Sequence, residues 1–129
     1  MKIAIAQLNY HIGNFEQNTA KIIAHIGKAK AEGADIVVFT ELSVTGYYPH
    51  DLLERKEFIE QSDEALNQIA LHCNGIAAVV GGPRINPEPR GKKLFNSAFF
   101  MYDKAIQQVV NKSLLPTYDI FDEYRHFEP

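Results

Sequence analysis

The chain of 129 residues contains a single cysteine, no long apolar run and no excess of basic residues. One cysteine excludes a disulfide framework within the chain. Polar residues from Gln7 onward interrupt the apolar start too early for a signal peptide, and no stretch approaches the ~20 apolar residues of a membrane span. The net charge of −3 does not indicate a basic surface that would bind the phosphates of a nucleic acid. We therefore expect a cytoplasmic protein that binds neither membranes nor nucleic acids.

Three common kinds of site also have no signature. The five histidines do not show the spacing of metal ligands. No Gly-rich phosphate loop is present. Ser43 and Ser113 lack the G-x-S-x-G elbow of serine hydrolases. We therefore expect no metal and no cofactor bound by this chain.

The sequence does contain the periodicities of a globular α/β domain spanning residues 1–129, with 46% hydrophobic and 22% charged residues. Residues 2–8 alternate as in a strand, and Asn14 is a helix N-cap with Gln17 three positions later. Apolar residues then recur at helical spacing as far as Gly33, and a buried strand covers 35–39. A strand–helix–strand order implies a right-handed crossover and a parallel pair.

The second half continues the alternation of helices and strands. We expect, in chain order, a helix over residues 54–73, a strand over 76–80 that Gly81-Gly82-Pro83 stops, an exposed loop over 84–93, hairpin strands over 94–102 and 106–111, and an ordered tail with a short helical turn over 115–129. These elements predict helices packed on a sheet.

Two charged residues follow predicted strands directly, at the ends where α/β folds place their sites. Glu41 is backed by Phe39 and Leu42, so partial desolvation would suit it to act as a general base. Lys112 follows the last strand and could stabilise an oxyanion. Taken singly, an ordinary solvated surface position is the favoured interpretation of each residue.

Cys73 and the aromatic tail are the other candidates. Cys73 lies at the C-terminal end of the second predicted helix, on its apolar face, where the helix dipole disfavours a thiolate. Core packing is therefore the favoured interpretation of Cys73. The tail over 116–127 mixes acids and bases with aromatics, which is typical of functional sites and of structural loops alike.

Several segments, in this order, resemble the nitrilase superfamily of carbon–nitrogen hydrolases. The matching segments are Met1–Gln7, Phe39-Thr40-Glu41-Leu42, Thr45-Gly46-Tyr47, Asn96-Ser97-Ala98 and Lys112-x-x-Leu115-Pro116. The resemblance implies a fold in which two sheets pack face to face between helices, an α-β-β-α sandwich. It also implies that this chain is a truncated part of that sandwich, lacking its C-terminal half.

Two stretches, 45–53 and 115–127, are similar to glutamine-dependent NAD synthetases, one branch of that superfamily. This narrower resemblance implies the N-terminal glutaminase domain, which hydrolyses the amide of glutamine. The ammonia would pass to a synthetase domain, absent from this chain, that uses ATP and Mg to convert nicotinic acid adenine dinucleotide into NAD. Four positions depart from the common pattern of this branch, and none of them is one of the two presumed catalytic residues: Thr40, Tyr48, His50 and His126.

The resemblance also implies roles for individual residues. Glu41 matches the general base and Lys112 matches the group that stabilises the oxyanion. Glu123 resembles a second acid that holds the lysine and the substrate, and Tyr118 would line the glutamine pocket. The family's nucleophilic cysteine would follow beyond residue 129, so the isolated chain is expected to be inactive. We also expect it to form homo-oligomers, because half a sandwich exposes apolar sheet surface.

Two other functions remain open at this point. One is a nitrilase-type amidase that acts on ureido acids or ω-amides and uses the same Glu41 and Lys112. The other is a non-catalytic binding or assembly module.

Overall fold

A mixed five-stranded sheet in the order β1-β2-β3-β4-β5 forms the frame of the chain. The computed structural model describes residues 1–118 and 121–129, so Asp119 and Ile120 of the tail motif lie outside the described residues. The strands are β1 (Ile3–Ala6), β2 (Ile36–Phe39), β3 (Ala77–Ile85), β4 (Leu94–Tyr102) and β5 (Ala105–Asn111). β1, β2 and β3 run parallel, and β4 and β5 are antiparallel to their neighbours. The predicted parallel pair and the predicted hairpin are both confirmed.

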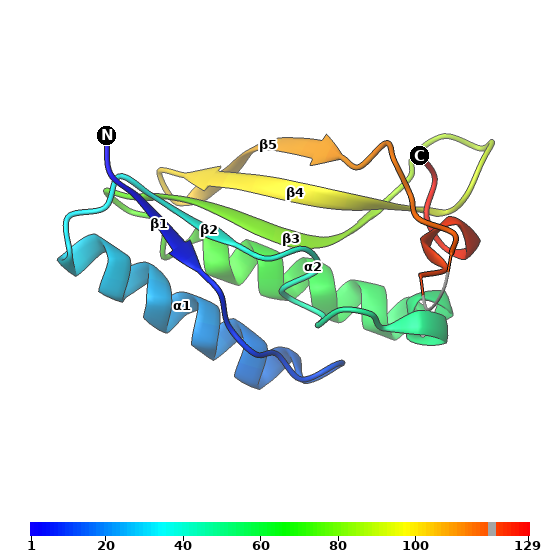
Figure 1. Cartoon of the computed structure of the whole chain (residues 1–129), viewed down its shortest axis with the longest axis horizontal. Helices are drawn as coiled ribbons and strands as arrows, with labels where there is room; N and C mark the ends of the chain where they lie inside the picture. The colour runs from blue at the N-terminus through cyan, green and yellow to red at the C-terminus, as the bar shows by residue number, and fades with distance from the viewer. Residues whose placement is uncertain (119–120) are drawn as a thin grey trace.

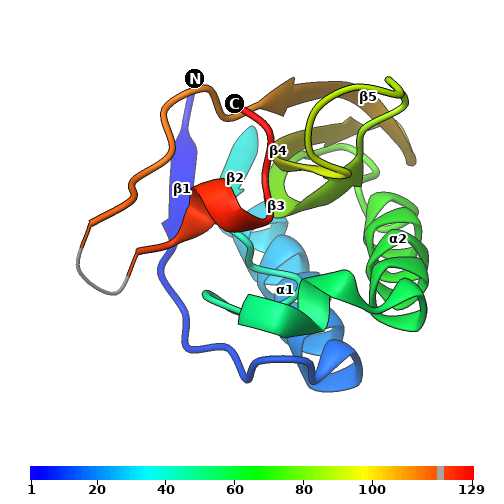
Figure 2. The same ribbon diagram turned by 90° about the vertical axis from the view of Figure 1, so that its right-hand side faces the viewer.

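Two helices, α1 (Phe15–Ala31) and α2 (Lys56–Ala70), cover one face of this sheet (Figures 1 and 2). The side chain of Asn14 caps α1 by accepting a hydrogen bond from the Gln17 N–H at 3.1 Å, as the sequence predicts. The core between helices and sheet includes the fully buried Ile22 and Ile69. No helix in the described part of the chain combines the length and apolar character needed to cross a bilayer.

The opposite face of the sheet carries no helix or further sheet among the described residues (Figure 1). Side chains alternate between faces along a strand, so the neighbours of core-facing Ala4, Ala6 and Val109 point to this side. Ile3, Ile5 and Val110 are accordingly 53%, 81% and 58% exposed. This arrangement of one sheet with helices on one face fits the nitrilase-type fold class expected from the sequence.

β3 is longer than the sequence predicts, and the expected end at Val80 is wrong. The strand continues to Ile85 because Gly81, Gly82 and Pro83 remain paired with β4. β2 pairs with β3 only as far as Val79, so Pro83 lies on a free edge of β3, where a missing N–H is tolerated. The predicted loop over 84–93 therefore begins two residues later than expected.

Gly81 allows the segment after β2 to lie directly against β3. A Cβ atom at Gly81 would fall 2.4 Å from the backbone nitrogen of Leu42 and 2.7 Å from the carbonyl oxygen of Thr40. Hydrogen bonds close the same contact: Ser43 Oγ accepts from the Gly81 N–H at 3.1 Å, and the Val44 N–H donates to the Gly81 carbonyl at 3.1 Å. The backbone that carries Glu41 is thereby fixed to the sheet.

We expect Gly81→Ala to lower the free energy of unfolding by about 2–3 kcal/mol, because the methyl group has no space and the neighbouring atoms are backbone. Gly27→Ala is the matched control. A Cβ at Gly27, inside α1, meets nothing within 4 Å, so this change should raise stability by up to ~1 kcal/mol. Urea denaturation of both variants measures the difference. Equal effects of the two substitutions would contradict the close-approach argument.

Candidate active site

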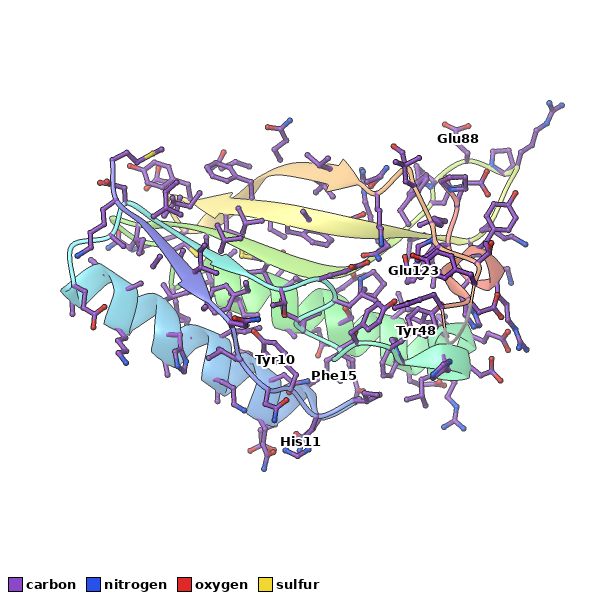
Figure 3. The ribbon with its side chains drawn as sticks, in the orientation of Figure 1. Tyr10, His11, Phe15, Tyr48, Glu88 and Glu123 are labelled. Atoms are coloured by element: carbon purple, nitrogen blue, oxygen red, sulfur yellow. The ribbon has the colours of Figure 1, made fainter. Side chains whose placement is uncertain are left out.

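Glu41, Lys112 and Glu123 converge at the end of the sheet where β2, β3 and β5 end and β4 begins. Lys112 Nζ lies 2.8 Å from Oε1 of Glu41 and 3.1 and 3.0 Å from the two carboxylate oxygens of Glu123. Glu41 follows β2, Lys112 follows β5, and Glu123 begins the short 3-10 helix η2 (Glu123–Arg125). Figure 3 shows Glu123 at this end of the molecule, close to Tyr48. The structure thus brings together three of the four site residues predicted from the sequence.

Glu123 is the buried member of this trio. Its side chain is 1% exposed, whereas those of Lys112 and Glu41 are 32% and 41% exposed. A buried carboxylate requires a cation and hydrogen-bond donors. Lys112 supplies the charge, the Tyr47 hydroxyl donates to Oε1 at 2.9 Å and Asn96 Nδ2 donates to Oε2 at 3.3 Å. Glu41 is the most exposed of the three side chains.

The surroundings of Lys112 and Tyr47 change their pKa values in the same direction. Burial by itself lowers the pKa of Lys112, but hydrogen bonds and charges from Glu41 and Glu123 outweigh it, so the pKa of Lys112 is raised. Burial and then the Glu123 carboxylate raise the pKa of Tyr47. Lys112 therefore remains a cation and Tyr47 a hydrogen-bond donor at neutral pH.

Sequence reasoning assigned no role to Tyr47 or Asn96, although both lie in segments that carry the family resemblance. Asn96 is 3% exposed and donates to both carboxylates of the site. Its signal in the sequence is the polar pair Asn96-Ser97 inside the mostly apolar strand β4. Tyr47 had no comparable signal, because its contact with Glu123 spans 76 residues of chain.

A small cleft of about 240 Å³ opens beside the trio. Glu41, Asn96 and Lys112 line its polar end, and Ala98 and Val110, on the uncovered face of the sheet, line its apolar part. A cationic donor, a partly exposed carboxylate and an apolar wall can bind a small polar group and exchange a proton with it.

Tyr118 and Cys73 lie outside this cluster. Tyr118 is 70% exposed, and its ring packs against Phe121 with centroids 5.7 Å apart. Phe121 in turn lies 6.3 Å from the ring of Tyr47, so two successive ring contacts lead from Tyr118 to the residue that donates to Glu123. Cys73 is fully buried, and desolvation raises the pKa of its thiol to about 11. The predicted core position of Cys73 is confirmed.

A second charged cluster links η1 (His50–Glu54) to η2. The buried His126 has Nε2 3.5 Å from Asp51 and Nδ1 4.0 Å from Glu54, and Arg125 lies 3.4 Å from Asp51. These three acid and imidazole groups are close enough to consider a metal ion. However, the carboxylates approach opposite edges of the imidazole, and Arg125 already supplies positive charge. Burial lowers the pKa of His126, so only the contact between Arg125 and Asp51 is an ion pair at neutral pH. We interpret the cluster as a polar network that ties the two segments together.

Comparison with known proteins shows which family this chain and its site residues belong to. The carbon–nitrogen hydrolase family matches residues 2–129. A glutamine-dependent NAD(+) synthetase from Xylella fastidiosa is 41% identical over 129 residues, which cover 99% of this chain and 23% of the relative. The corresponding enzyme from Synechocystis is 43% identical over 97% of this chain and again 23% of the relative. The chain thus spans about a quarter of the length of these curated relatives.

Solved structures give the same result. Glutamine-dependent NAD+ synthetase from Acinetobacter baumannii, in complex with adenosine diphosphate, superimposes with a TM-score of 0.89 at 37% identity, covering 98% of this chain and 23% of that protein. An amidase from Nesterenkonia sp. superimposes with a TM-score of 0.80 at 25% identity, covering 100% of this chain and 48% of that protein. One variant of that amidase shows acrylamide added to its active-site cysteine.

We expect Lys112→Met to lower the free energy of unfolding by about 2 kcal/mol at neutral pH, because Glu123 stays buried without its counter-ion. Since folding raises the pKa of Lys112, this contribution is complete below the unfolded value of about 10.4 and is lost as the pH rises through the folded value. Above neutral pH, the difference between parent and variant should therefore persist until the pH is strongly alkaline.

The control for this prediction is Lys56→Met, which removes the exposed pair between Lys56 and Glu60. Its effect should remain below ~0.5 kcal/mol. Urea unfolding of parent and variants at several pH values measures both quantities. An equally small effect of both substitutions would show that Glu123 does not depend on the lysine.

Proposed function

The chain belongs to the carbon–nitrogen hydrolase family, and from that premise we propose that its Glu41–Lys112–Glu123 cluster hydrolyses the side-chain amide of glutamine and releases ammonia. The observation that carries this proposal is the ammonium group of Lys112, which follows β5, held between the carboxylate of Glu41, which follows β2, and that of Glu123 in η2. Such a cluster offers a proton acceptor and an oxyanion-stabilising donor within one small cleft.

In the proposed mechanism, Glu41 accepts the proton of a cysteine thiol that the rest of the protein supplies. A free thiol has a pKa of about 8.5 and is mostly protonated at neutral pH, so it requires this base. The thiolate then attacks the amide carbon, and Lys112 stabilises the negative charge that develops on the carbonyl oxygen, an effect of roughly 3 kcal/mol per donor. Glu41 returns the proton to the leaving ammonia and then activates the water that hydrolyses the thioester.

Glu123 has a supporting role in this proposal. Because both of its oxygens accept hydrogen bonds from Lys112, it fixes the direction in which the ammonium group points. Tyr118 would approach the substrate only from the rim of the site, as its exposed position suggests.

We choose glutamine as the proposed substrate because of the relatives of the chain, and not because of the shape of the cleft. The two relatives at 41% and 43% identity are glutamine-dependent NAD(+) synthetases. On this basis, the ammonia would serve a synthetase domain that binds ATP and Mg and lies outside this chain. Residues 1–129 would form part of a single hydrolase domain, in a cytoplasmic protein that assembles as a homo-oligomer.

A second candidate is an amidase with another substrate. The likeness to the Nesterenkonia amidase, which covers the whole of this chain, supports it. Ureido acids and ω-amides would use the same Glu41 and Lys112, so only substrate preference separates the two activities. A non-catalytic module has less support, since it gives no reason for burying Glu123 beside a lysine.

The longest natural product of the gene that encodes these residues, called the complete gene product below, provides the test. We expect it to release ammonia from L-glutamine in preference to asparagine, simple aliphatic amides, ω-amides and ureido acids. Glu41→Gln should lower this activity by about 1,000-fold, because the base is lost while the shape is kept. Glu60→Gln, an exposed change on α2, is the control and should leave activity unchanged. Preference for another amide would favour the second candidate.

We also expect Cys73→Ala to leave ammonia release by the complete gene product within about twofold of the parent, because a buried thiol with a pKa of about 11 provides no nucleophile. The isolated 129-residue chain, in which Cys73 is the only thiol, should release none. Ammonia assays with both proteins check this. Loss of turnover in a correctly folded Cys73→Ala variant would assign the nucleophile to Cys73 and overturn the mechanism.

A further inference from the structure

Asn96, near the start of β4, contacts all three charged residues of the site. Its Nδ2 donates to Oε1 of Glu41 at 2.5 Å and to Oε2 of Glu123 at 3.3 Å. Its backbone carbonyl accepts a hydrogen bond from the Lys112 N–H at 2.8 Å. Since Asn96 is 3% exposed and held in the sheet between β3 and β5, it provides a fixed point for all three residues.

The orientation of the Asn96 amide follows from its partners. A side-chain amide has two N–H donors on nitrogen, whereas its oxygen only accepts. The two groups that Asn96 faces are carboxylates, which only accept when ionised. The nitrogen must therefore face both of them, and its two hydrogens are divided between Glu41 and Glu123.

The two carboxylate oxygens of Glu41 differ in the hydrogen bonds that they accept. Asn96 and Lys112 both donate to Oε1, the latter at 2.8 Å. Among residues 1–118 and 121–129, no donor is hydrogen-bonded to Oε2. A group that is to accept a proton needs a lone pair that is not already committed, and Oε2 meets that condition.

We propose that Asn96 is a positioning residue for the hydrolysis proposed above: its amide links Glu41 to Glu123, occupies Oε1 of Glu41 and leaves Oε2 as the oxygen that takes the proton. The inference rests on that proposed function. In the step concerned, the S–H bond of the cysteine breaks, its proton goes to Oε2, and its electron pair stays on sulfur, which then bonds to the amide carbon.

The contribution of Asn96 differs from ordinary strand packing. Residues that only fill the core are replaceable by apolar groups of similar size. Asn96 instead prevents the partly exposed Glu41 side chain from turning away from Lys112. A catalytic group that is misplaced by about 1 Å can lose on the order of 100-fold in rate. We therefore expect removal of the amide to lower kcat and to leave KM for glutamine nearly unchanged.

The experiment uses the complete gene product and two variants, Asn96→Ala and Asn86→Ala. Asn86 is a matched control because it is another buried asparagine, and its amide, within the described part of the chain, bonds only to backbone atoms of its own loop. Asn96→Ala should lower kcat for glutamine by on the order of 100-fold. In its crystal structure, the Glu41 carboxylate should leave its place beside Lys112. Asn86→Ala should retain kcat within about threefold, with Glu41 in place.

A third variant gives a readout that loss of packing would not produce. In Asn96→Asp, the introduced carboxyl can donate a hydrogen bond only while it is protonated. Its activity relative to the parent should therefore rise as the pH falls from about 8 to about 5, toward the ordinary pKa of a carboxyl group. A ratio that stays constant across this range would overturn the positioning role.

The remaining outcomes separate this inference from the proposed function. If the parent hydrolyses glutamine and Asn96→Ala loses no more kcat than Asn86→Ala, the inference is wrong and the function stands. If the parent hydrolyses no amide, the function is wrong, and with it the proton transfer to Oε2. The crystal structure still decides the positioning itself, since an unmoved Glu41 carboxylate in Asn96→Ala contradicts it.

Discussion

The burial of the Glu123 carboxylate is the constraint on which the rest of the site depends. An ionised carboxylate that is 1% exposed is stable only with a counter-charge and with hydrogen bonds to both oxygens. Lys112, Tyr47 and Asn96 meet that requirement together, and they come from three separate parts of the chain. Because each of them has its own place in the fold, Glu123 in turn determines where their polar groups lie.

The sheet supplies these partners by bringing strand ends to one edge. Parallel β2 and β3 end where antiparallel β4 begins, so Glu41, Asn96 and Lys112 meet although 71 residues separate the first from the last. Gly81 allows this close approach, because only a residue without a side chain lets the backbone of Glu41 lie directly against β3. Both helices pack on the other face of the sheet, which leaves the cleft open on the uncovered side.

The sequence predicted the parts of this arrangement that depend on local patterns. The Asn14 cap, the buried strand before Glu41 and the hairpin before Lys112 all follow from periodicity and turn residues, and so do the positions of these two charges at strand ends. The end of β3 was mispredicted because Gly81-Gly82-Pro83 is a strong turn signal, and only pairing with β4 shows that the strand continues. The network around Glu123 was beyond local reasoning, since its contacts link residues as much as 76 positions apart.

The two acids are distinguished by how their oxygens are used. Each oxygen of the buried Glu123 carboxylate accepts two hydrogen bonds from the described residues, so this group is committed to holding Lys112. Glu41 is 41% exposed and uses only Oε1 for its contacts with the described residues. A group that must accept and return a proton needs access to its partner, while a group that positions a cation needs rigidity. The same lysine can thus be shared by two chemically identical side chains, because burial assigns rigidity to Glu123 and access to Glu41.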